Sequence, residues 1–152
     1  MIITELTEKE YLNTDIKAAK AYSQFEQLLA ALRKKELPDI IAEAINEDVK
    51  DLNSLSTADQ FKAIVKQKQS KIIKLLEKQL KVVPKNYYRN LWMVLGMSAF
   101  GLPLGVAIGL SIGNIGLLGV GLPIGMAIGL AVGAGMDKKA LQDGRQLDVE
   151  IK

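Results

Sequence analysis

The sequence of 152 residues contains no cysteine and no histidine. Without cysteine there is no disulfide, no thiolate nucleophile and no cysteine-ligated zinc. Without histidine there is no His-dependent catalytic triad and no imidazole metal ligand. Enzymatic chemistry would then require carboxylates, lysine, serine or tyrosine, and no pairing of a nucleophile with a base is visible among these residues. We therefore expect no enzyme, no catalytic residue, no metal site and no cofactor.

Two further absences divide the chain. Residues 1–95 contain no glycine, whereas all 13 glycines lie between Gly96 and Gly144. Residues 90–136 form a run of 47 positions without a charge, while residues 1–89 carry 29 of the 37 charged side chains. The remaining 105 residues are too few to enclose this run in a soluble shell. A lipid bilayer is the simplest solvent for it, and a buried helical hairpin of a soluble complex remains the alternative.

The uncharged run has the length of a membrane hairpin. A spanning helix needs about 20 apolar residues, so the run accommodates two. We place these helices at 91–112 and 115–136, with a turn at Gly113 and Asn114, because Gly-Asn favours a turn.

The flanks of the run are typical of a membrane interface. Tyr87, Tyr88, Arg89 and Trp92 stand where the first helix would leave the headgroups. Cations lie on both outer flanks and none lies in the turn, which predicts that both termini are cytoplasmic. The N-terminus has no features of a cleavable signal. We expect a bacterial inner membrane as the location, with insertion through the hairpin itself.

The hairpin contains an internal repeat. Residues 101–113 recur as residues 121–133, with nine of 13 positions identical and glycine at every fourth position. Such stripes allow helix backbones to approach closely in lipid. The predicted packing residues are Gly101, Gly105, Gly109, Gly113, Gly121, Gly125, Gly129 and Gly133.

This repeat resembles that of the bacterial glycine-zipper membrane family. The resemblance covers residues 96–140 and does not extend to residues 1–89. It implies close-packed membrane helices, oligomers and, as in several members, pores or membrane disruption.

Each helix also carries a second line of small residues, roughly opposite the glycines at about 100° per residue. Gly96 falls near this line, and its central members are Ala107, Ser111, Ala127 and Ala131. We call this second line the second seam. The glycine stripe can pack within the hairpin and the second seam against a neighbouring subunit, which predicts a homo-oligomer. Gly105→Leu or Gly125→Leu should then break the oligomers. The alternative is that glycine merely tightens one intramolecular hairpin, giving a monomer or a dimer.

Pro103 and Pro123 occupy matched places in the two repeats. Each should bend its helix, because proline lacks the amide donor and its ring meets the carbonyl four residues earlier. The bend is either a gating hinge or a shape that lets helices nest. Neither helix carries an ionisable residue, which argues against a proton relay, a voltage sensor or a charge-selective filter.

The residues before the hairpin show helical patterning. Capping signals predict a short helix near Thr7 and longer helices over 14–35, 38–51 and 56–83. The expected fold is all-α. It comprises a small N-terminal helical bundle (1–89), a transmembrane glycine-zipper hairpin (90–136) and a polar cytoplasmic tail (137–152).

Charge is unevenly divided in the predicted bundle. Residues 1–60 have a net charge of −5 and residues 61–89 a net charge of +8, so the segment 60–85 is a basic amphipathic helix just before the membrane. It can bind anionic lipid, or the acidic first half in the same or a neighbouring subunit, or nucleic acid, which the lack of interleaved aromatics disfavours. The residues concerned are Lys62, Lys66, Lys74, Lys78, Lys81 and Lys85.

Two functions follow from these patterns. The first is a homo-oligomeric membrane protein whose hairpins assemble into a pore, channel or membrane-perturbing complex controlled by the cytoplasmic helices. The second is a non-conducting anchor or scaffold that presents a helical module to a cytoplasmic protein partner.

Overall fold

The computed structural model describes residues 2–151, which form two compact units. The first contains the chain up to Val83 together with Leu147–Ile151, and the second is Pro84–Gln146. Helices dominate both units, so the predicted all-α class is confirmed. The exception is a small two-stranded sheet of β1 (Val83–Lys85) and β2 (Gln146–Glu150).

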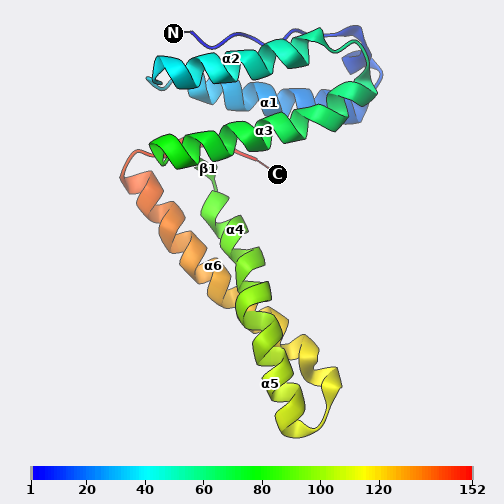
Figure 1. Ribbon diagram of the computed structural model, residues 1–152, viewed down its shortest axis with the longest axis vertical. Coiled ribbons are helices and arrows are strands. Elements are labelled where there is room, and N and C mark those ends of the chain that lie inside the picture. The colour runs from blue at the N-terminus through cyan, green and yellow to red at the C-terminus, as the bar shows by residue number, and fades with distance from the viewer. Residues whose placement is uncertain (1, 152) are drawn as a thin grey trace. The chain divides into compact units, whose positions relative to one another are not determined.

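The first unit is built from three helices, labelled in Figure 1: α1 (Ile16–Arg33), α2 (Asp39–Ser54) and α3 (Ala58–Leu80). Side chains start two of them, because Asp15 accepts a hydrogen bond from the amide of Ala18 (2.9 Å) and Thr57 from that of Gln60 (3.4 Å). Where a helix was expected near Thr7, the chain is extended, and a 3₁₀ turn (Glu10–Asn13) follows.

Large apolar side chains fill this first unit. Helix α3 packs against both α1 and α2, and the fully buried residues come from all three helices. They include Phe25, Leu28, Leu29, Leu32, Ile45, Val49, Leu52, Phe61, Val65, Ile72 and Leu76. Strand β2 adds Leu147 and Val149, which are buried, so the expected polar tail instead contributes two residues to this core.

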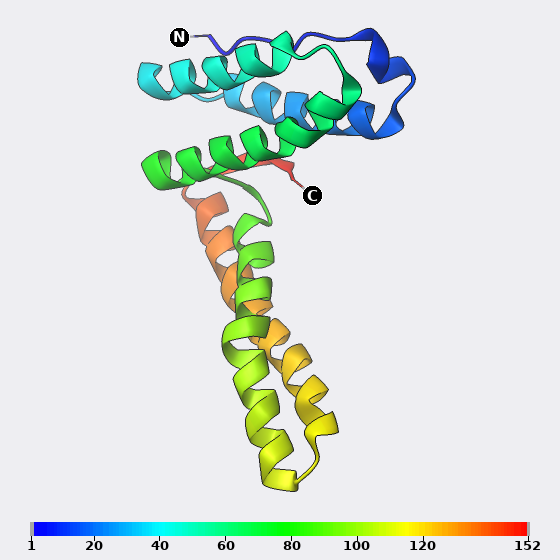
Figure 2. The same cartoon turned by 45° about the vertical axis from the view of Figure 1, so that its right-hand side comes forward.

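The second unit is a helical hairpin. Its first arm consists of α4 (Tyr87–Gly96), a π-helical turn (Met97–Gly101) and α5 (Leu102–Ile112). The chain turns at Gly113, which has φ 72°, and at Asn114, whose Oδ1 accepts from the amide of Gly116 (2.9 Å). A 3₁₀ turn (Ile115–Leu117) leads into the second arm, α6 (Leu118–Gln142). Figures 1 and 2 both show the two arms running side by side to this turn.

Both arms are long and apolar enough to cross a membrane. The helical stretches Tyr87–Ile112 and Ile115–Gln142 contain windows of mean hydropathy 1.9 and 2.2, of which only 22% and 17% is buried. The first arm begins at Tyr87, before the predicted start at residue 91, and α6 continues past the predicted end at Met136 to Gln142.

Candidate functional site

The contact between the two arms is a line of glycines in which backbone touches backbone. A Cβ atom on Gly121 would overlap the backbone of Gly101 and Gly105, and one on Gly125 would overlap that of Gly96 and Gly101. Gly129 meets the carbonyl of Trp92 in the same way. The interface therefore has no room for a single added methyl group, which is the arrangement that a glycine stripe in an apolar helix favours.

Six of the predicted glycines line this contact closely: Gly101, Gly105, Gly121, Gly125, Gly129 and Gly133. Gly109 is buried against the turn, with its Cβ position 3.2 Å from the carbonyl of Asn114. Gly113 has nothing within 4 Å of its Cβ position and serves the turn instead. Its inclusion in the packing stripe was wrong, because its positive φ ends α5 as a C-cap.

Gly96 also belongs to the contact, contrary to its predicted place near the second seam. In a uniform α-helix the five residues from Gly96 to Gly101 advance about 500°, which would turn Gly96 away from the stripe. The π turn takes up the extra residue, since the amide of Leu102 donates to the carbonyl of Met97. Gly96 and Gly101 thereby share one face of the first arm.

The π turn lies immediately before Pro103. Proline has no amide to bond the carbonyl four residues earlier, so the regular ladder is interrupted there in any case. Ser98 donates its hydroxyl to the carbonyls of Val94 and Leu95 (3.1 Å each) on the preceding turn. Pro123 lies inside α6 with no π turn before it, so the two matched prolines occupy different local structures.

Asp137 extends the stripe on α6 by one further step of four residues after Gly133. Its side chain is buried (7% exposed) and accepts from the amides of Tyr88 (3.0 Å) and Arg89 (2.9 Å) in the first turn of α4. A carboxylate stabilises a helix N-terminus by bonding its free amides and by opposing its positive dipole end. Asp137, predicted to belong to the polar tail, thus joins the two arms at the end of the hairpin opposite the turn.

The outer surface of the hairpin is apolar. Among the residues described, 14 of the 18 exposed large apolar side chains lie between Leu91 and Val132. The second seam lies on this surface, since Ala107, Ser111, Ala127 and Ala131 are all exposed. Ser111 donates to the carbonyl of Ala107 (2.7 Å), so its hydroxyl is used within its own helix. The hairpin itself therefore leaves the seam uncovered.

The predicted interface anchors surround the start of α4. Tyr88 is buried, Tyr87 and Trp92 are half-buried, and Arg89 is exposed. The rings of Tyr87 and Tyr88 meet edge to face, with centroids 5.2 Å apart. This cluster pairs aromatic rings with a cation at one end of the apolar surface.

Some of the basic residues of α3 are bound by the acidic half of the same unit. Lys62 pairs with Asp15 (2.6 Å). Lys68 pairs with the buried Asp48 (2.7 Å) and with Asp51 (2.5 Å). The side-chain hydrogen bond from Lys62 lowers the pKa of Asp15, and that from Lys68 lowers the pKa of Asp51.

The other named lysines lie outside this acidic surface. Lys66, Lys74, Lys78, Lys81 and Lys85 are all exposed. Helix α3 therefore has two basic faces, one bound by carboxylates and one exposed. Lys81 and Lys85 lie beyond its end at Leu80, with Lys85 in β1, so the predicted helix over 60–85 was too long.

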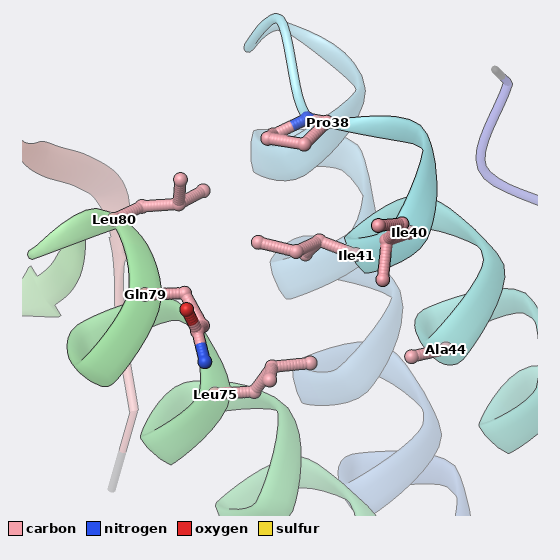
Figure 3. Close-up of a pocket in the computed structure, with 7 residues that line it drawn as sticks. All are labelled: Pro38, Ile40, Ile41, Ala44, Leu75, Gln79 and Leu80. Carbon is pink, nitrogen blue, oxygen red and sulfur yellow. The ribbon is translucent and has the colours of Figure 1, made fainter.

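An apolar groove of about 340 Å³ separates the start of α2 from the end of α3. Figure 3 shows Leu75 and Leu80 of α3 facing Ile41 and Ala44 of α2 across it, with Gln79 between. Pro38 and the exposed Ile40 complete the lining. Within residues 2–151, no group of three or more carboxylates is arranged to hold a metal ion.

In comparisons with known proteins, no protein-family model, no curated protein and no solved structure matched the chain. The likeness to glycine-zipper proteins therefore rests on the spacing of the repeat.

Proposed function

We propose that the chain is a self-associating membrane anchor whose hairpin lies in the bilayer and whose helical unit is an interaction module. The observation that carries this proposal is the inverted construction of the hairpin. Its interior is glycine and backbone, and its large apolar side chains face outward. In water this exposure is costly, whereas lipid solvates it, with about 1.5–3 kcal/mol gained for each large apolar side chain that is fully buried.

Self-association follows from the uncovered seam. Lipid chains provide no hydrophobic drive between helices, so association in a membrane depends on close packing at small residues. The exposed line of Ala107, Ser111, Ala127 and Ala131 supplies such a surface. Gly105 and Gly125 are already used within the hairpin, so Gly105→Leu or Gly125→Leu would disrupt the hairpin before any oligomer.

The polar groups of the hairpin favour an anchor over a pore. Ser98 and Ser111 give their hydroxyl protons to carbonyls of their own helix, and residues 90–136 contain no charge to line a water-filled path. A gated pore is the second candidate, favoured by the π turn beside Pro103, since π turns frequently mark functional sites in helices. Control of such a pore would fall to the helical unit.

The location follows from the same features. We propose the bacterial inner membrane with both termini cytoplasmic, supported by the cations flanking the uncharged run and by the aromatic cluster at α4. The exposed lysines of α3 are suited to an anionic leaflet, where each nearby cation contributes about 1 kcal/mol.

Single cysteines test the assembly cleanly, because the chain has none of its own. Ser111→Cys lies on the second seam and should form disulfide-linked dimers in vesicles. The neighbouring Leu110→Cys is exposed but lies outside the seam, so it should not. Adding Ala107→Leu should suppress the Ser111→Cys product. Equal crosslinking at both positions would count against the seam, and release of the chain by alkaline extraction would count against membrane insertion.

Flux measurements separate the two candidates. The anchor predicts no release of ions or dye from vesicles of anionic lipid that carry the wild-type chain. Release that Ala107→Leu abolishes would establish the pore instead.

A further inference from the structure

The N-terminal segment, residues 2–8, lies extended along the helical unit (Figures 1 and 2). We infer that α1 and α2 form a binding site for an extended peptide and that this segment is its intramolecular occupant. The proposal deepens the interaction-module half of the proposed function by naming the class of partner. It does not depend on self-association of the hairpin.

Two asparagines of α2 hold the segment by its backbone. Asn46 donates to the carbonyl of Ile2 (3.0 Å) and accepts from the amide of Thr4 (2.8 Å). Asn53 donates to the carbonyl of Glu5 (3.1 Å) and accepts from the amide of Thr7 (2.8 Å). The asparagines are seven residues apart, about two helical turns, so both side chains leave the same face of α2.

Side chains of α1 hold the other edge of the segment. Arg33 donates to the carbonyls of Ile3 and Thr4 (3.3 Å each), and Tyr22 donates its hydroxyl to the carbonyl of Leu6 (3.0 Å). Glu26 accepts from the amide of Leu6 (3.4 Å) and pairs with Arg33 (2.6 Å).

All of these hydrogen bonds to the segment are to its peptide groups, which every peptide possesses. The site therefore reads backbone rather than sequence, as surfaces that bind extended peptides do. Specificity comes from two apolar anchors, since Ile3 and Leu6 are buried (4% and 5% exposed) while Thr4, Glu5 and Thr7 are exposed. The three-residue spacing of the anchors matches the period of an extended polyproline II chain.

The ligand class is thus an extended peptide with large apolar residues at positions one and four. A tethered occupant competes at an effective concentration in the millimolar range, so a free peptide binds measurably only when the tethered segment is weakened. The source proposed is the N-terminal segment of a second copy, because residues 2–8 carry the two apolar anchors that this site buries. A segment of a different protein is the other outcome of the test.

The test uses the full chain in vesicles with Leu6→Ser, which weakens the tethered occupant without altering α1 or α2. A labelled peptide of residues 2–9 should bind this variant at least about tenfold more tightly than it binds wild type, because the competing segment is released. Asn46→Ala in the same background should weaken binding about tenfold through loss of two hydrogen bonds. Ile40→Ala, an exposed residue of α2 that lies outside the depression beside Thr4, is the matched control and should leave binding unchanged.

Two results would overturn the peptide-site proposal. If the Leu6→Ser chain keeps its helical circular dichroism and its Ser111 crosslinking yet binds no peptide, the segment is a structural strap and the proposal fails while self-association stands. A peptide carrying Ile3→Ser and Leu6→Ser should not bind, and equal binding of this control would also overturn the proposal.

Paired cysteines identify the source of the ligand. Thr4 and Glu43 line the same surface depression. A disulfide between a Thr4→Cys chain and a Glu43→Cys chain would show exchange between two copies. With peptide binding established, its absence would assign the site to a segment of another protein.

Discussion

The two units of this chain solve the packing problem in opposite ways. The helical unit places large side chains inside, such as Phe25 and Leu29, and surrounds them with charge. The hairpin places glycine inside and large side chains outside. In the first unit stability comes from apolar surface removed from water. In the second it comes from backbone contact that only the absence of side chains permits. Shortening a large apolar side chain should therefore destabilise the helical unit far more than the hairpin, and adding a methyl group to a buried glycine should destabilise the hairpin.

The largest effect is expected from shortening a core side chain of the helical unit. Phe25→Ala leaves a cavity at a fully buried site and should cost about 3–5 kcal/mol in the free energy of unfolding. Ile128→Ala on the outer face of the hairpin removes a comparable apolar side chain that is 39% exposed, and should change stability little. Denaturant unfolding in micelles, followed by circular dichroism, checks both. A large loss at Ile128 would contradict an outward-facing role.

The reverse change should harm only the hairpin. Gly125→Ala adds one methyl group where the backbone of Gly96 and Gly101 leaves no space, and should destabilise the arm contact by about 3 kcal/mol, the upper end of overpacking costs. Gly135→Ala is the matched control on the same helix. Its Cβ position is open, so it should stabilise α6 by up to about 1 kcal/mol through helix propensity. Hydrogen exchange of the arms reports the difference.

A smaller effect is expected at the open end. Asp137→Ala removes the acceptor of two amides at the start of α4 and should cost about 1–3 kcal/mol through unsatisfied donors. Exchange should quicken at Tyr88 and Arg89 in particular. Asp137→Asn retains one acceptor oxygen and should restore part of the protection, whereas Asp143→Ala, in the following turn, should leave α4 unchanged. Unaltered exchange in Asp137→Ala would remove Asp137 from this capping role.

The π turn allows a sharper test of the hairpin. Deleting Ala99 leaves Gly96 and Gly101 four residues apart, so a regular α-helix then carries both on one face. We expect the arms to remain paired, with exchange protection close to that of wild type. Deleting Ile128 from α6, which has no π turn to lose, should rotate Gly129 and Gly133 out of the interface and abolish protection. Similar loss in both deletions would contradict the role of the π turn in aligning the glycines.

Comparison with the sequence shows which information the residue pattern carries. The turn at Gly113 and the two glycine stripes, Gly101–Gly109 and Gly121–Gly133, follow from composition and a four-residue period, and the structure has both. The assignment of Gly96 was wrong because periodicity assumes uniform winding, and a π turn leaves no signal except the proline after it. Asp137 could have been found, since it continues the four-residue step beyond Gly133. The contacts of Asn46 and Asn53 could not, because they depend on where an extended segment lies.

The smallest effect should come from pH, and only in the helical unit. The pKa of Asp15 is lowered by its hydrogen bond from Lys62, so its contribution to stability is present above the unfolded value of 3.8 and is lost as the pH falls through the lower, folded value. The pKa of Lys62 is raised, so its contribution is present below 10.5 and is lost only above that value. Thermal unfolding of the full chain should thus shift modestly downward on acidification below pH 3.8, and Asp15→Asn should reduce the shift while keeping an oxygen to cap α1. Because this pair is partly exposed, salt should also reduce the shift.

The glycine contact contains no titrating group between Gly96 and Gly133, so exchange protection there should be the same on both sides of this transition. If that protection collapsed together with the acid transition, the two units would not be stabilised by the separate means that their packing indicates.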